Sequence, residues 1–215
     1  YEALVRVIPK GGKVEADRDS LRITGCDEVV VLHVAGTSYV MDYSKKYKGP
    51  HPGERLRQQL DAASKRSYDD LLARHIGDFQ KIFNRAEVFF GKTAPEVVSL
   101  PTDQRIKAYA DGGADPELEA TLFQMGRYLL ISCSRRPGLP ANLQGLWNDS
   151  NNPPWHSDYH ANINIQMNYW PAEPANLGDC HFTFFDLIES QLDPWRKATA
   201  ADKEFEKASG RVRGW

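Results

Sequence analysis

The feature that most constrains this chain is a change in hydrophobic period near residue 60. Before it, "ALVRVIP" and "KVEAD" flank Lys10-Gly11-Gly12, which predicts two strands joined in a hairpin. The stretch "EVVVLHVAGTSYV" at 28–40 contains an apolar run that predicts a strand buried on both faces. After a Pro/Gly loop at 46–55, apolar residues recur every three to four positions from Asp61, as a helix face requires. The sequence therefore predicts strands followed by helices packed on helices, in two architectural units.

Two long helices are indicated by their ends and their apolar faces. The first carries an apolar stripe made of Leu71, Leu72, His75, Ile76, Phe79, Ile82 and Phe83. The second begins at Asp115-Pro116-Glu117, which supplies an N-cap, a first-turn proline and an acid, and it ends before Arg135-Arg136-Pro137-Gly138. Its predicted inner face comprises Leu118, Leu122, Met125, Leu129 and Ser132. Two further helices are expected at 179–192 and 194–208.

Composition and charge argue against several classes of protein. The formal net charge of -2 and the lack of a basic run give no reason to expect a nucleic-acid partner. No apolar stretch approaches the length that spans a bilayer, so no membrane partner is expected. Cys26, Cys133 and Cys180 lack the spacing of a disulfide framework or a zinc site, so we expect small buried hydrophobic groups. The chain opens directly in a predicted strand without a leader, and we expect it to be a piece of a longer protein.

Polar amides and large aromatic rings are concentrated where the helical pattern lapses, in residues 139–174. Eight of the nine asparagines lie within 142–176, and four of the five tryptophans lie within 147–195. Long irregular stretches in compact domains are usually functional or disordered, and this aromatic content argues against disorder. We therefore expect the functional residues here.

The pattern "NINIQ" alternates polar and apolar residues, which predicts an extended backbone. Such a strand would turn His160, Asn162 and Asn164 to one side and both isoleucines to the other. An amide offers a carbonyl and an NH2 group, which match sugar hydroxyls that both donate and accept hydrogen bonds. The segment thus predicts a sugar-binding surface.

Aromatic side chains near this segment could pack against the apolar C–H faces of a sugar ring; they are Trp147, Trp155, Tyr169 and Trp170. An alternative stays open at this point. The amides could cap loops and helix ends while the rings fill a core, as both residue types often do.

A metal site is a second alternative, because His156, Asp158 and His160 alternate and would face one way on a strand. No fourth ligand is obvious, so no metal is expected. Glycosidic hydrolysis usually needs two carboxylates. The acids near the aromatic cluster are Asp149, Asp158 and Glu173, and the pattern assigns none of them to catalysis.

Two long stretches are recognisable: "LPTDQRIKAYADGGADPELEATLFQMGRYLLISCSR" and "PANLQGLWNDSNNPPWHSDYHANINIQMNYWPAEPANLGDC". They closely resemble glycoside hydrolase family 95, the α-L-fucosidases. The likeness extends to "VVVLHVAGTSYV", "HIGDFQKIFNRAEVFFG" and the terminal "GRVRGW", and so covers nearly the whole chain.

The resemblance implies an α+β multidomain fragment of a considerably longer protein. Residues 1–60 would be the last strands of an N-terminal β-supersandwich, and residues 61–100 a helical linker. Residues 101–215 would be the first helices of an (α/α)6 barrel that holds the active site.

The resemblance also implies a reaction that inverts the anomeric centre and needs no cofactor. A glutamic acid protonates the leaving oxygen, and an aspartate activates water with help from asparagines that match Asn162 and Asn164. His160 matches a sugar-contacting position, where relatives that act on α-L-galactosides have threonine. The acid and the base are expected beyond Trp215, in the remainder of the same polypeptide.

The implied substrate is a fucosylated oligosaccharide or glycan, met in a secreted or periplasmic compartment. Two other functions remain open from the sequence. The protein could be an α-L-galactosidase of the same family or a non-catalytic sugar-binding relative.

Overall fold

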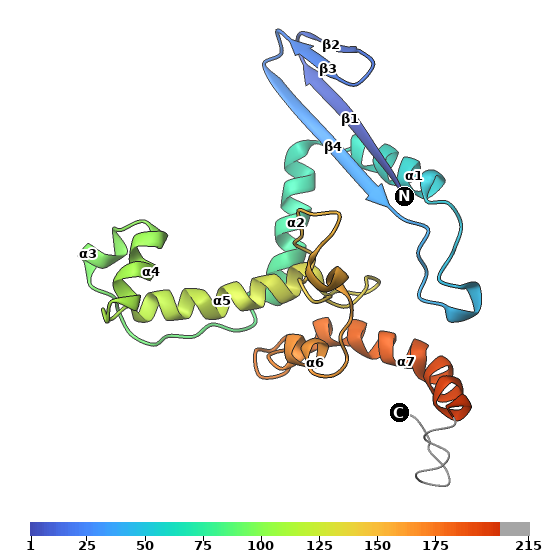
Figure 1. Ribbon diagram of the computed structural model, residues 1–215. Coiled ribbons are helices and arrows are strands. Elements are labelled where there is room, and N and C mark those ends of the chain that lie inside the picture. Colours follow the sequence, from blue (N-terminus) through green and yellow to red (C-terminus); the bar gives the residue numbers. More distant parts are fainter. Residues whose placement is uncertain (203–215) are drawn as a thin grey trace. The chain divides into compact units, whose positions relative to one another are not determined.

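A computed structural model describes residues 1–202, which divide into two compact units (Figure 1). The first unit comprises residues 1–77 together with the described part of 193–215, and the second comprises residues 78–192. Strands come first and helices follow, which confirms the predicted order. The division of the chain at residues 60 and 100 stays a prediction. Within the described residues, no helix combines the length and the apolar character that crossing a membrane demands.

The first unit contains two antiparallel strand pairs. β1 (Glu2–Lys10) pairs with β4 (Glu28–Gly36) over their whole lengths, and β2 (Lys13–Ala16) pairs with β3 (Leu21–Thr24) at the far end of that ribbon (Figure 1). The predicted hairpin between β1 and β2 is therefore wrong. Gly11-Gly12 carries the chain out of β1, and a Cβ on Gly12 would lie 2.3 Å from the carbonyl oxygen of Thr24. The glycine pair thus lets one strand pair follow the other closely instead of closing a turn.

Helix α1 (Gly53–Ser64) packs against β1 and β4 and buries Leu56 and Leu60. Arg6 on β1 donates to Ser64 Oγ at 2.7 Å and to Asp61 Oδ1 at 2.7 Å, which ties the strand to the end of the helix. The helix begins inside the stretch that the sequence predicts as a loop.

Only one face of the β1–β4 ribbon is covered within residues 1–202. Along β4, half-buried residues alternate with exposed ones, and Val29 and Val31 are exposed. The prediction of a strand buried on both faces is therefore wrong for the described chain. A continuous apolar run does not by itself show whether other elements cover one face of a strand or both.

The second unit is helical. Helix α2 (Tyr68–Phe83), which crosses the unit boundary, confirms the first predicted helix. The helices that follow are α3 (Pro95–Val98), α4 (Thr102–Ala110), α5 (Pro116–Cys133), α6 (Asn164–Tyr169) and α7 (Gly178–Ala201).

The predicted start of α5 is confirmed, and its cap is part of a buried cluster. Asp115 accepts a hydrogen bond from the backbone N–H of Leu118 at 3.0 Å, as an N-cap does. The same carboxylate accepts from Arg105 Nη2 at 2.8 Å and from Thr93 Oγ1 at 2.6 Å. The hydrogen bond from Arg105, followed by those from Thr93 and Leu118, holds the pKa of Asp115 well below its usual range.

The predicted inner face of α5 is wrong. Arg127, Leu130 and Ile131 are buried, whereas Leu122 and Met125 are exposed in the described chain. Apolar residues occur on more than one side of this helix, so periodicity alone cannot choose the side that packs. The buried side of α5 also contains Arg127, and a search for apolar residues does not find an arginine.

Helix α7 runs through Pro194 without a break, so the prediction of two helices separated at that point is wrong. A proline removes one backbone hydrogen bond, and a long helix retains the others on both sides. The last residues of the second predicted helix and the "GRVRGW" stretch lie outside the described residues. Of the three cysteines, Cys133 and Cys180 are buried as expected, while Cys26 is only half-buried.

Candidate functional site

The asparagine-rich segment is not extended where the sequence predicts a strand. Helix α6 begins at Asn164, and the backbone N–H of Ile165 donates to the carbonyl of His160 at 3.0 Å. Ile165 is buried while Ile163 is exposed, so the two isoleucines do not share one face. The predicted period-two arrangement of this segment is therefore wrong. The five alternating residues of NINIQ are too few to distinguish a strand from a helical turn that buries one side chain.

The amides of the segment fall into two groups. Asn168 Nδ2 donates to the carbonyl of Asn142 at 3.0 Å, and Asn176 Nδ2 donates to the carbonyl of Arg85 at 3.3 Å. These two amides hold loops in place, as the alternative interpretation of the asparagine-rich segment predicts. In contrast, the side-chain amides of Asn162 and Asn164 have no hydrogen-bond partner within residues 1–202. Asn162 is exposed and Asn164 is half-buried, so both keep hydrogen-bonding capacity for another molecule.

The four aromatic residues predicted to bind the sugar differ in their exposure to solvent. The indoles of Trp155, Trp170 and Trp147 are 74%, 62% and 49% exposed, so each offers apolar surface to solvent. Tyr169 is only 3% exposed. Its prediction as a pocket wall does not match this placement, because its ring lies in the interior of the unit.

Tyr169 instead anchors α6. Its hydroxyl accepts from the backbone N–H of Ala141 at 2.8 Å and lies 2.6 Å from Ser134 Oγ. Its ring stacks on that of Phe184, with centroids 5.0 Å apart. Burial, the largest influence, raises the pKa of Tyr169. The residue therefore fixes the helix that begins at Asn164.

The loop before α6 has an unusual backbone. Trp155, His156 and Ser157 have φ values of 54°, 58° and 53°, which non-glycine residues rarely adopt. Three such residues in a row store strain, a feature that clusters at functional sites. The ring of His160 lies edge-on to that of Trp155, with centroids 6.1 Å apart, and its Nε2 is 3.4 Å from the Trp155 carbonyl oxygen.

The strand that would align His156, Asp158 and His160 is not formed, because the short turn η2 (Pro154–Ser157), with left-handed backbone at Trp155 and His156, occupies its start. The geometry predicted for the metal alternative is therefore wrong. Within residues 1–202, no group of three histidine, cysteine or acidic side chains could hold a metal ion. Among the nearby acids, Glu173 Oε1 lies 3.0 Å from His181 Nδ1, which gives Glu173 a loop-holding contact.

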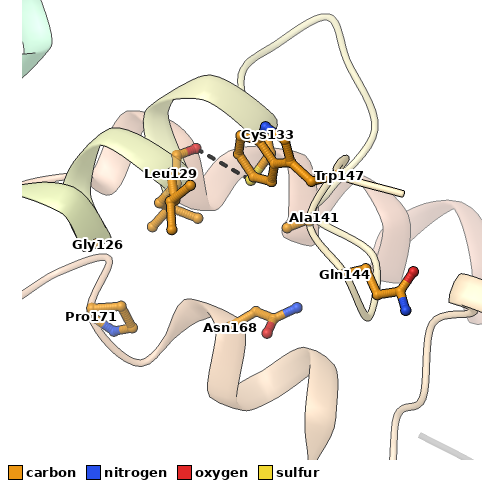
Figure 2. A pocket seen from close by; sticks show the side chains of 10 residues that line it. Gly126, Leu129, Cys133, Ala141, Gln144, Trp147, Asn168 and Pro171 are labelled. Carbon is orange, nitrogen blue, oxygen red and sulfur yellow. Dashed lines mark hydrogen bonds between the residues drawn. The ribbon is translucent and has the colours of Figure 1, made fainter. Parts of the chain in front are cut away.

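A hollow of about 250 Å³ lies between α5, the loop that follows it and α6 (Figure 2). Most of its lining is apolar, with the amides of Gln144 and Asn168 as its polar groups; the lining residues are Gly126, Leu129, Leu130, Cys133, Ala141, Gln144, Gly145, Trp147, Asn168 and Pro171. Burial raises the pKa of the Cys133 thiol to about 11, so this lining thiol is not a ready nucleophile.

The structure brings Trp147 to this hollow but places the other predicted residues outside its lining: Trp155, His160, Asn162, Asn164, Tyr169 and Trp170. The sequence analysis missed Gln144 and Asn168 as lining residues. Their signal was present, because both belong to the same amide-rich stretch. Which amide faces a hollow and which holds a loop depends on contacts that a sequence does not show.

Three indoles are exposed, and the side-chain amides of Asn162 and Asn164 have no hydrogen-bond partner within residues 1–202. Groups of these two kinds can meet the C–H faces and the hydroxyls of a sugar. Comparison with known protein families identifies one that matches. The glycosyl hydrolase family 95 catalytic domain matches residues 67–215, which is more than half of the chain. The chain belongs to this family, as the resemblance implied.

Curated relatives carry fucosidase names. The chain is 36% identical over 197 residues to alpha-L-fucosidase 2 of Arabidopsis thaliana, an alignment that covers 90% of this chain and 23% of the relative. It is 38% identical over 191 residues to probable alpha-fucosidase A of Aspergillus niger, with 83% and 24% covered. It is 37% identical over 214 residues to probable alpha-fucosidase A of Aspergillus oryzae, with 93% and 29% covered. The chain thus spans about a quarter of the length of these relatives.

Proposed function

We propose that this chain is part of an inverting α-L-fucosidase that removes terminal fucose from oligosaccharides or glycans. Family membership and the names of the relatives support the reaction class. The observation that carries the site assignment is the pair of amides, on Asn162 and Asn164, that no residue in 1–202 binds. In this proposal the rest of the polypeptide supplies the acid and the base, and completes the barrel and the β-supersandwich.

The two amides act on the attacking water. A water held between an aspartate and two neutral amides keeps one lone pair directed at the anomeric carbon while its proton moves to the carboxylate. Such placement lowers the entropic part of the barrier and adds to general base catalysis. Neutral amides suit this task because, unlike cations, they do not lower the basicity of the aspartate that accepts the proton.

His160 and the exposed indoles bind the sugar. Trp147, Trp155 and Trp170 pack against its apolar C–H faces, and His160 contacts it from the loop before α6. The carboxylates and positioned water carry the chemistry, which requires no organic cofactor. Such substrates point to a secreted or periplasmic protein.

Fucose release by the full-length protein tests the proposal. Asn162→Ala and Asn164→Ala should each lower kcat by about a hundredfold or more, because a displaced water is a misaligned nucleophile. Asn151→Ala, an exposed change in the same loop region, is the matched control and should release fucose at the wild-type rate. NMR of the first-formed product should show the β anomer. Wild-type turnover in both variants would exclude the water-positioning role.

The same assay separates the two other functions. An α-L-galactosidase would prefer the galactoside to the fucoside, and His160→Thr should move the wild-type preference in that direction. A non-catalytic relative would bind fucosylated oligosaccharide but release no fucose at any enzyme concentration.

A further inference from the structure

The tight turn at 142–145 leads directly to the half-exposed indole of Trp147. The backbone N–H of Gly145 donates to the carbonyl of Asn142 at 3.0 Å, and the N–H of Asn142 donates back at 3.3 Å. Asn142 Oδ1 also accepts from the N–H of Gln144 at 2.8 Å. Three hydrogen bonds within four residues make this turn a stiff unit.

A second contact ties the turn to the strained loop. Ser157 Oγ donates to Gln144 Oε1 at 2.7 Å, so the side chain of the turn holds the last of the three residues with positive φ. Asn168 on α6 donates to the carbonyl of Asn142 from another side. The turn is therefore held from two neighbouring segments as well as from within: Asn168 binds its backbone, and Ser157 binds its Gln144 side chain.

Gly145 meets the indole at very close range. A Cβ on this residue would lie 2.7 Å from Cζ3 and 2.8 Å from Cε3 of Trp147, while the next nearest atom, Cys133 Sγ, is 3.9 Å away. Side-chain carbons do not approach a ring so closely, so the Trp147 ring lies where only a glycine permits it. Figure 2 shows Trp147 beside Cys133 on one side of the hollow, with Asn168 and Pro171 on the other.

We propose that Gly145 is a positioning residue that sets the orientation of the Trp147 ring at the sugar site. The turn is held on several sides, whereas the Trp147 side chain is 49% exposed and can change its torsion angles. A methyl group at position 145 would therefore displace the ring and leave the turn in place. This inference rests on the proposed function, in which Trp147 packs against the sugar.

The test compares Gly145→Ala with Trp147→Ala and with the double variant in the full-length protein. Gly145→Ala should lower kcat/KM about tenfold, chiefly through KM, since a displaced indole loses contacts made with substrate and transition state alike. In the Trp147→Ala background, the change at position 145 should have no further effect. The fluorescence of Trp147, obtained as the difference between each protein and its Trp147→Phe counterpart, should shift in Gly145→Ala.

Backbone strain needs its own control, because Gly145 has φ +71°. Gly25 has a similar φ of +67°, and a Cβ there would meet only Gly12 Cα at 3.8 Å. Gly25→Ala therefore introduces the same strain without a ring contact, and it should keep wild-type kinetics.

The outcomes separate the two proposals. If Trp147→Ala impairs the enzyme but Gly145→Ala does not, the positioning role is wrong and the proposed function stands. Losses that add in the double variant would also overturn the positioning role, since Gly145 would then act through other groups. If Trp147→Ala itself has wild-type kinetics, the sugar contact of the indole is wrong, and the inference fails with it.

Discussion

Two regions of the second unit use polar side chains in opposite ways. In the interior, Arg127 is 2% exposed and donates to five acceptors, four of them backbone carbonyls and one the Gln124 side chain. In the segment around α6, the amides of Asn162 and Asn164 have no partner within residues 1–202. A buried donor must be satisfied to be tolerated, whereas an accessible donor without a partner remains available to a ligand. The contrast therefore separates residues that hold the fold from the residues that we propose to meet a substrate.

The largest effect is expected at the interior arginine. Arg127→Leu removes the donors for the last carbonyls of α2 and for the Ala175 carbonyl, and should lower the free energy of unfolding by about 3 kcal/mol or more. Chemical denaturation of the full-length protein measures this loss. Arg136→Leu, which breaks a more exposed pair with Asp186, should cost much less. Equal losses in both variants would contradict the central role of Arg127.

A smaller effect distinguishes the two kinds of asparagine. Asn168→Ala removes one hydrogen bond to the carbonyl of Asn142 and should lower the free energy of unfolding by about 1 kcal/mol. Asn162→Ala and Asn164→Ala should change it by no more than about 0.5 kcal/mol, since neither amide has a partner to lose within residues 1–202. Thermal unfolding of the three variants gives the comparison. The distinction breaks down if the Asn162 or Asn164 variant is the least stable of the three.

The last effect is confined to low pH and is a change in the slope of the unfolding free energy against pH. The pKa of Asp115 is lowered in the folded chain, so its stabilising contribution is complete above the ordinary carboxyl pKa of about 4. That contribution is lost as the pH falls from this value through the lowered pKa. Asp115→Asn cannot titrate, so its unfolding free energy should fall less steeply below pH 4 than that of the wild type. Parallel profiles for the two proteins would show that Asp115 does not contribute to acid sensitivity.

Local signals predicted the start of α5 better than they predicted which elements pack together. The Asp-Pro-Glu start of α5 is confirmed because an N-cap satisfies donors within three residues of itself. The pairing of β1 with β4 was missed because Gly11-Gly12 is compatible both with a hairpin and with a connection to the next strand pair. The buried face of α5 was missed because Arg127 is placed by carbonyls that lie 41 to 48 residues away in the sequence.

For the candidate site too, the sequence predicted less than the structure shows. The sequence marks the stretch in which the site is proposed, because asparagines and tryptophans gathered in one irregular stretch are unusual. The separation of Tyr169 from Trp147, Trp155 and Trp170 was not predictable, because burial of a ring depends on what packs over it. The role of Gly145 was equally hidden, since a glycine in a turn is expected whether or not a ring lies against it.

The amino-acid sequence alone determined the family, the order of strands and helices, and the stretch that carries the unusual chemistry. These follow from residue types and from spacings of a few positions along the chain. Only the tertiary structure decided which amides hold loops and which have no partner within residues 1–202. That choice depends on carbonyls and rings brought together from distant positions, and a short-range pattern contains no information about them.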